Sequence, residues 1–493
     1  MKKDILVIKI IKLGLLFPLI LSACAPLISP TSEPEIVSGS VVPETISSTP
    51  LPTRPVYQPG QLVEYIAKTG DNLPALASHF NTTVNEIRQA NPIIPAEVTT
   101  LPPGLPMKIP IYYESLWGNS FQILPDSLFV NGPAQVGFDP VEFVKNQPGW
   151  FKYYSEYAGN EQRTGGQLVK YVAENFSISP RLLLMLIEYQ LKGLSQPNPP
   201  DQSNLYPLGF HEVNHQGLYK QLLLAANTLN NGYYQWRDGS LKTFDHLDGR
   251  LERPDPWQNA ATVALDYYFS RILSKADYEK ATYNEGFAAV YQAYFGEVWK
   301  SEKSHIPGSL QQPKMYFPFL PGKEWAFTGG PHTGWGEGSP RAALDFAPPS
   351  VVTGCKPTEE WATAMADGII VRSGQASAVL DLDGDRDERT GWVIFYLHLA
   401  TDGLIKTGTP VKTGDLLGHP SCEGGQSTGT HVHIARKYNG EWIAAEGPLA
   451  FDLEGWKAIA GKDPYQGKLI KFSREITACV CSDVFSHIQS EAK

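Results

Sequence analysis

The residues best suited to chemistry are histidines and aspartates in the last third of the chain. His431 and His433 lie two positions apart in Thr-His-Val-His, so both side chains would point to the same face of a strand. His332, Asp345 and His398 add residues of the same two types in the same stretch. Zinc in a hydrolase needs three protein ligands and one open position for water, and histidine with aspartate suits a metal that acts as a Lewis acid. The set therefore predicts one zinc ion that activates water for hydrolysis.

Strands must position these residues. From about residue 318 the sequence consists of strand-length apolar segments separated by Gly and Pro turns, such as IIVRSG, WVIFYLHLA, THVHIARKY and EWIAA. Residues 427–429, Ser-Thr-Gly, directly precede the two alternating histidines and favour a turn that brings the backbone close to a cleft. The pattern predicts an antiparallel β domain over residues 318–455, followed by a C-terminal extension over residues 456–493.

The segments GGPHTG, ALDFA, YLHLA and CEGGQSTGTHVH resemble the lysostaphin/LytM-type zinc metallopeptidases, and most closely their β-lytic (LasA-like) branch, over about residues 320–450. The resemblance implies that His332, Asp345 and His433 bind zinc. It also implies that His431 is the general base for the zinc-bound water, and that His398 orients this water or stabilises the oxyanion. The substrates of the family are stem or cross-bridge peptides of peptidoglycan, and the β-lytic branch favours bonds next to glycine.

One spacing departs from the commoner LytM pattern, in which the first ligand histidine lies four residues before the aspartate. Arg341 occupies that position here. His332 precedes Asp345 by 345 − 332 = 13 residues and takes the role, as in the β-lytic branch. The assignment therefore requires the loop of residues 333–340 to bring His332 into the site.

The chain has five cysteines. Leu21–Cys24 resembles a bacterial lipobox, in which the cysteine receives the lipid. Four cysteines then remain, and their spacing alone leaves three pairings open. Resemblance to the β-lytic branch, where a disulfide braces the CEGG turn, favours Cys422 with Cys355, the other cysteine within the predicted β domain.

The N-terminus indicates export. Residues 1–24 combine a lysine-rich start, a short apolar run and a small-residue cleavage site. With lipid on Cys24, we expect a protein anchored to the outer face of the cell membrane; a plain signal peptide or an uncleaved anchor is the alternative. Residues 25–60 are rich in Pro, Ser and Thr and predict an extended linker.

A small domain follows the linker. Residues 61–111 show the order strand, helix, helix, strand, and YIAKTGDNLPALASHF, NEIRQANP and LPPGLPMKIP resemble a LysM module. The resemblance implies binding to the glycan strands of peptidoglycan or chitin, with Gly70, Asp71 and Asn91 as the candidate binding residues. A βααβ domain that has lost its ligand is the alternative.

The middle of the chain is predicted to be helical. After a connector over residues 112–138, the apolar spacing in residues 139–305 is typical of helices. The stretch SPRLLLMLIEYQLKG resembles the helix that carries the catalytic Glu of lysozyme-like and lytic-transglycosylase domains. Gln190 stands where the acid would be, so Glu188 is the candidate acid, and a degenerate scaffold or a structural carboxylate is the alternative.

Alternating aspartates at positions 381, 383, 385 and 387 are a second candidate metal site. Carboxylates at this spacing can fill a Ca²⁺ shell, but Trp392 stands at the position of the EF-hand's closing Glu and helices are not predicted to flank the loop. We therefore favour a solvated hairpin loop over a Ca²⁺ site.

The length and composition predict a multidomain globular chain. The 493 residues predict about three domains, and a net charge of −10 without a Lys/Arg block argues against nucleic acid as a partner. The predicted fold is a small βααβ LysM, a mostly α-helical middle domain and a C-terminal antiparallel β-sheet metallopeptidase domain. The predicted function is a peptidoglycan-targeted zinc endopeptidase. The alternatives are a non-catalytic peptidoglycan-binding protein or hydrolase activator, and a glycan-cleaving enzyme acting through the middle domain.

Overall fold

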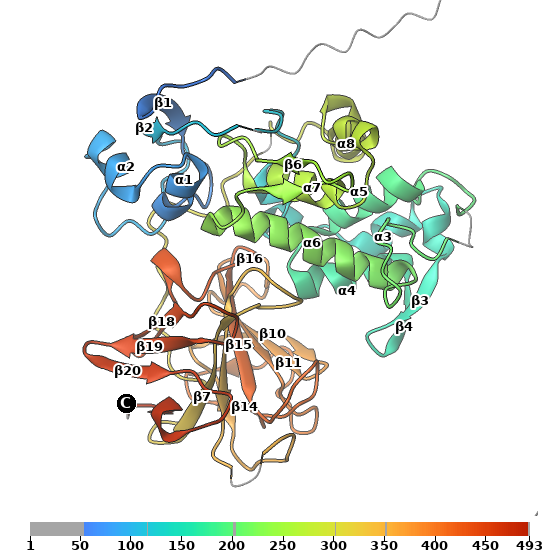
Figure 1. Cartoon of the computed structure of the whole chain (residues 1–493). Coiled ribbons are helices and arrows are strands. Elements are labelled where there is room, and N and C mark those ends of the chain that lie inside the picture. The colour runs from blue at the N-terminus through green and yellow to red at the C-terminus, as the bar shows by residue number, and fades with distance from the viewer. Residues whose placement is uncertain (1–53, 116, 201–203, 301, 351–352, 492–493) are drawn as a thin grey trace, which may run out of the picture. The chain divides into compact units, whose positions relative to one another are not determined.

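The structure is a computed structural model in which a LysM domain, a helical domain and a β domain follow one another along the chain, as predicted (Figure 1). It describes residues 54–491 except 116, 201–203, 301 and 351–352. The predicted signal peptide of residues 1–24, the predicted lipidation site Cys24 and linker residues 25–53 lie outside the described residues. Among the described helices, none is both long and apolar enough to cross a membrane.

The LysM domain has the βααβ order. Its elements are β1 (Gln61–Ile66), α1 (Leu73–His79), α2 (Val84–Ala90) and β2 (Pro106–Ile111), with β1 antiparallel to β2. The polar residues before each helix act as caps: Asn72 accepts from the Ala75 amide, and Thr83 forms a capping box with Glu86. Both helices pack their apolar faces on the two strands.

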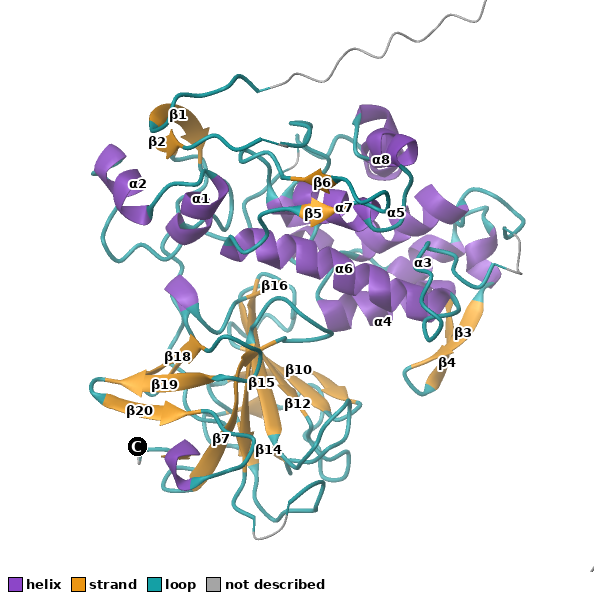
Figure 2. Cartoon of the chain, in the orientation of Figure 1, coloured by secondary structure: helices purple, strands orange, loops and turns teal. Residues whose placement is uncertain are grey.

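Helices dominate the next segment (Figure 2). Their bounds are α3 (Pro140–Lys145), α4 (Gly165–Phe176), α5 (Pro180–Leu191), α6 (Leu218–Asp238), α7 (Ala260–Ser270), α8 (Lys275–Ala281) and α9 (Ala289–Phe295). Two hairpins accompany them, β3 (Ser155–Ala158) with β4 (Glu161–Thr164) and β5 (Phe244–Asp245) with β6 (Leu251–Glu252). Buried residues between Ile123 and Val130, which the sequence assigns to the connector, belong to the same hydrophobic cluster as these helices.

The C-terminal segment is an antiparallel β domain. Its main sheet has the order β13-β10-β11-β12-β15-β8-β7-β21, with β16 paired to β15. The bounds of these strands are β7 (Glu324–His332), β8 (Ala343–Ala347), β10 (Gly368–Gly374), β11 (Ser377–Asp381), β12 (Trp392–Leu397), β13 (Pro410–Val411), β15 (Val432–Tyr438), β16 (Glu441–Trp442) and β21 (His487–Gln489). A small pair is formed by β9 (Ala362–Thr363) and β14 (Leu416–Gly418).

The C-terminal extension is part of this domain. It supplies most of a second sheet, of β17 (Asp452–Leu453), β18 (Trp456–Ala460), β19 (Gly467–Lys471) and β20 (Arg474–Thr477). Its last strand, β21, then pairs with β7 in the main sheet. Residues beyond 455 therefore lie beside the strand that ends at His332.

A buried arginine of α6 connects the three domains. Arg237 Nε lies 3.1 Å from a Glu441 oxygen in β16, and its Nη2 lies 3.2 Å from Asp126. The same guanidinium donates to the carbonyl of Thr69 in the LysM domain. His305 also contacts Glu441, at 2.6 Å. Because the side chains of Arg237, Asp126 and Glu441 are at most 9% exposed, loss of one partner would leave a buried charge without compensation.

Candidate active site

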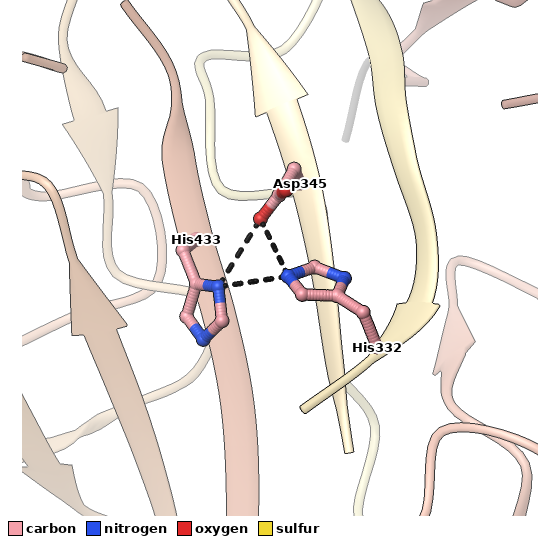
Figure 3. A group of neighbouring side chains, drawn as sticks. All are labelled: His332, Asp345 and His433. Carbon is pink, nitrogen blue, oxygen red and sulfur yellow. Dashed lines mark hydrogen bonds and ion pairs between the residues drawn. The ribbon is translucent and has the colours of Figure 1, made fainter. Parts of the chain in front are cut away.

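Three side chains from adjacent strands meet at the centre of the β domain (Figure 3). His332 Nε2 lies 3.0 Å from His433 Nδ1 and 3.3 Å from Asp345 Oδ1, and His433 Nδ1 lies 3.2 Å from the same oxygen. A tetrahedral zinc ion with bonds of about 2.0–2.1 Å separates its ligand atoms by roughly 3.3 Å. The three atoms are therefore spaced as the ligands of one small metal ion.

Hydrogen bonds on the far side of each ring determine which nitrogens face one another. His332 Nδ1 donates to the Gly330 carbonyl at 2.8 Å, and His433 Nε2 donates to the Gly334 carbonyl at 3.2 Å. In its neutral form, each ring then directs the lone pair of its other nitrogen toward Asp345. Two such lone pairs and a carboxylate at close range repel one another unless a proton or a metal ion lies between them.

Asp345 is held in place by its strand register. It is the direct cross-strand partner of His433, and Gly329 lies opposite it on the other neighbouring strand, β7. A Cβ at Gly329 would collide with the Asp345 carboxylate, so this position requires glycine. Burial alone would raise the pKa of Asp345, but His332 and His431 lower it well below its usual value. Oδ1 is buried without a hydrogen-bond donor among the described residues, as expected of a ligand atom.

His431 and His398 lie beside this group. His431 Nδ1 donates to the Gly429 carbonyl at 2.8 Å, and its Nε2 lies 3.7 Å from Asp345 Oδ1. The His398 ring centre is 4.5 Å from that of His431, and His398 Nδ1 donates to the Glu423 carbonyl at 2.7 Å. Burial and the two neighbouring imidazoles lower the pKa of His398 to about 4, which keeps it neutral. Each ring thus has one nitrogen free to accept a proton or a hydrogen bond.

The backbone at His398 is unusual, because its φ of 64° places a residue with a side chain in the left-handed region. This conformation directly follows β12, whose last residue, Leu397, is the cross-strand partner of His433. Such backbone conformations persist where the surrounding structure holds them and are frequent at functional sites.

Tyr465 is a site residue that the sequence did not indicate. Its ring stacks on His332, with ring centres 4.1 Å apart. It lies in the turn between β18 and β19, in the C-terminal extension, and its carbonyl accepts from the Gly330 amide. Nothing in the local sequence separates this tyrosine from others in turns, since only the pairing of the extension with the main sheet brings it to the cleft.

The site opens into a cleft of roughly 1370 Å³ that His332, Asp345, His398, His431, His433 and Tyr465 all line. Cys355 and Cys422 form a disulfide with an S–S distance of 2.05 Å, which is the favoured pairing, and it ties residues near Gly354 to the turn before His431. The cleft is also lined by Val480, Cys481 and Ser482, and Cys481 forms a second disulfide with Cys479.

The candidate glycan-binding residues of the LysM domain make internal contacts. The Asn91 side chain bonds to both backbone groups of Lys108, and Asp71 accepts from Tyr65 Oη and the Lys68 amide. Gly70, with φ of 77°, lies directly against the guanidinium of Arg237. These residues are therefore placed to shape the LysM loops and to fit them against α6.

Glu188 lies apart from this site, in α5. Its carboxylate accepts from the amides of Leu194 and Ser195 at 2.8 and 3.2 Å and from the Ser195 hydroxyl at 2.6 Å. These bonds hold the turn that follows the helix. The geometry matches the structural-carboxylate alternative.

The aspartates between β11 and β12 form a ladder of turns. Asp381, Asp383, Asp385 and Asp387 each accept, through Oδ1, the amide two residues further along. Oxygens of the first three lie close enough together to surround an ion. The aspartates therefore alternate in the sequence because their hydrogen bonds fold the hairpin loop. This agrees with the hairpin loop that the sequence favours over a Ca²⁺ site.

Comparisons with known proteins agree with the domain order. Residues 65–110 match the LysM domain, and residues 122–308 match the N-terminal domain of LasA. Protease LasA of Pseudomonas aeruginosa is 22% identical over 343 residues, which are 66% of this chain and 75% of LasA. The β-lytic metalloendopeptidase of Achromobacter lyticus is 30% identical over 166 residues, 32% of this chain and 41% of that protein.

Among solved structures, the M23 metalloprotease pseudoalterin is 26% identical, with a TM-score of 0.29 over 34% of this chain and 96% of that one. Both curated relatives are peptidases by name, and the match to LasA is longer than residues 122–308, which match its N-terminal domain. The chain is a metalloendopeptidase that joins a LysM domain to a LasA-like, LytM-type peptidase.

Proposed function

We propose that the protein is a zinc endopeptidase that hydrolyses stem or cross-bridge peptides of peptidoglycan, and that its LysM domain retains it on the glycan strands. The observation that carries the proposal is the convergence of His332 Nε2, Asp345 Oδ1 and His433 Nδ1 at separations of 3.0–3.3 Å. These three residues would hold the metal. When bound there, zinc supplies Lewis-acid polarisation of the scissile carbonyl and a lowered pKa for its water.

The chain's own histidines would move the proton. With Nδ1 donating to Gly429, His431 offers Nε2 as the base that takes a proton from the attacking water and returns it to the leaving amine. His398 donates from Nδ1 to Glu423, so its Nε2 is free to accept a hydrogen bond and orient that water. The cleft then serves to align an extended peptide across the site.

The LysM domain would supply retention rather than chemistry. Weak affinity for the glycan keeps the peptidase near its substrate and raises the local concentration of peptide bonds. Asp71 and Asn91 would contribute by fixing the loops, since their side chains bond to the LysM backbone. The predicted lipid on Cys24 would restrict the enzyme to the outer face of the membrane.

Digestion of purified peptidoglycan by the soluble protein lacking residues 1–24, with and without a zinc chelator, tests this function. We expect new amino termini that disappear with the chelator and return with added Zn²⁺. An absence of products with zinc-loaded protein would favour the binding or activating alternative. New sugar ends would instead support the glycan-cleaving alternative, which the bonded carboxylate of Glu188 does not favour.

A further inference from the structure

The loop between β7 and β8, residues 333–340, has a direct role in the site. It follows His332, and the Gly334 carbonyl within it accepts the hydrogen bond from His433 Nε2 at 3.2 Å. That bond decides which nitrogen of His433 faces Asp345. The position of one loop carbonyl therefore determines whether the third ligand atom points into the site.

Within the loop, the Gly334 amide donates to the Pro340 carbonyl at 3.3 Å and Thr333 Oγ1 donates to the Trp335 carbonyl at 3.0 Å, but neither bond involves residues 336–338. Gly336 and Gly338 have φ values of 79° and 90°, and residues 336–338 are exposed. Three glycines in Gly-Trp-Gly-Glu-Gly allow many backbone conformations in the absence of outside contacts. One such contact is the Trp335 ring, which packs edge-on against Phe395 with ring centres 5.8 Å apart.

The helical domain adds polar contacts at Glu337 and Ser339. Asn227 Oδ1 accepts the Glu337 amide at 2.8 Å, and Asn231 Oδ1 accepts the Ser339 amide at 2.7 Å. The two asparagines are one turn apart in α6 and therefore share a face. The fit is close, because a Cβ at Gly336 or at Gly338 would collide with the asparagine oxygen opposite it.

We propose that Asn227 and Asn231 are positioning residues of the peptidase, which hold the loop so that the Gly334 carbonyl orients His433 for the metal. The inference rests on the proposed metal site and adds a role for the helical domain in the peptidase. Contact between α6 and the loop then strengthens metal binding.

Removal of the two acceptor oxygens tests the proposal. N227A/N231A removes both, whereas N227D/N231D keeps an acceptor oxygen of the same shape at each position. Thr228→Ala, in the same helix but at a side chain with no hydrogen bond to the loop among the described residues, is the matched control. Each folded protein is titrated with Zn²⁺ in competition with a fluorescent chelator, and amide hydrogen exchange is followed in residues 333–340.

We expect N227A/N231A to weaken zinc binding about 10- to 100-fold and to speed exchange in the loop, as is typical when a group supporting a ligand is lost. N227D/N231D and T228A should stay within about threefold of the wild type. The single variants N227A and N231A should give intermediate losses, and they replace the double variant if it does not fold.

Two outcomes would overturn the proposal in different ways. Wild-type zinc affinity in N227A/N231A would show that the asparagines do not position the site, while leaving the metal site itself intact. A finding that the wild-type protein binds no Zn²⁺ would contradict both the proposed function and this inference.

Discussion

His433 and Asp345 are direct cross-strand partners, with His433 Nδ1 3.2 Å from Asp345 Oδ1. Directly opposed residues on one face of an antiparallel pair bring their side chains together without any loop movement. Two of the three proposed ligands therefore rest on the hydrogen-bond ladder of the sheet. The third, His332, lies at the end of β7, after an irregularity in the pairing with β8 that follows Gly329.

Substitutions at the two alternating histidines should separate metal binding from catalysis. H433A removes a proposed ligand and should lose most of the bound zinc together with hydrolysis. H431A should keep zinc but lose at least about 100-fold in rate, because only the proton acceptor is removed. Metal content of the purified proteins and release of new amino termini from peptidoglycan measure the two effects. Equal zinc retention in the two variants would contradict the roles assigned here.

The sequence indicates His433 through a local signal, whereas His332 and Asp345 are identified as ligands through the resemblance of GGPHTG and ALDFA. The spacing of His431 and His433 by two predicts a shared strand face, and the turn residues around each segment mark the strands. Tyr465 and Asn231 carry no such signal. Each reaches the site through contacts between segments far apart in the chain, as in the bond from Ser339 to Asn231. Periodicity cannot report pairings of this kind.

Gly329→Ala should damage the site without touching a ligand. The new Cβ would collide with the Asp345 carboxylate, and the closely packed sheet leaves the side chain little room to move away. We expect zinc affinity to fall by at least tenfold while the far-ultraviolet spectrum of the protein is preserved. Gly425→Ala, where the nearest atom to a new Cβ is in the His398 ring at 3.5 Å, is the control. Unchanged zinc affinity in G329A would mean that Asp345 is not a ligand.

The Cys355–Cys422 disulfide should stabilise the rim of the cleft. The disulfide closes a loop with a sequence separation of 67. For a loop of this length, the chain-entropy model gives a stabilisation of the folded state of about 4 kcal/mol. C355S/C422S should therefore unfold at lower urea concentration and show faster hydrogen exchange around residue 430. The control is C479S/C481S, since that bond spans a separation of only 2 and closes almost no chain. An equal loss of stability in the control would contradict the stabilising role proposed for the Cys355–Cys422 disulfide.

Glu441 should make the stability of the protein depend on pH in the acid range. Burial would raise its pKa, but Arg237 and His305 lower it from the ordinary value of 4.5 to about 2. A carboxyl group with a lowered pKa in the folded state adds stability above pH 4.5, and this contribution is lost as the pH falls toward 2. This pKa difference between the unfolded and the folded state corresponds to about 3 kcal/mol in the free energy of unfolding at neutral pH.

E441Q removes this charge while keeping the shape of the side chain, and leaves buried Arg237 with Asp126 as its remaining ion-pair partner among the described residues. We expect about 3 kcal/mol less stability at pH 7, measured by urea unfolding, and a flatter profile between pH 4.5 and pH 2, because the group that titrates there is gone. Glu475→Gln is the control, since its ion pair with Lys468 is about half exposed and contributes little. An E441Q profile parallel to that of the wild type would show that Arg237 does not depend on Glu441, and that the three domains are held together mainly by their apolar contacts.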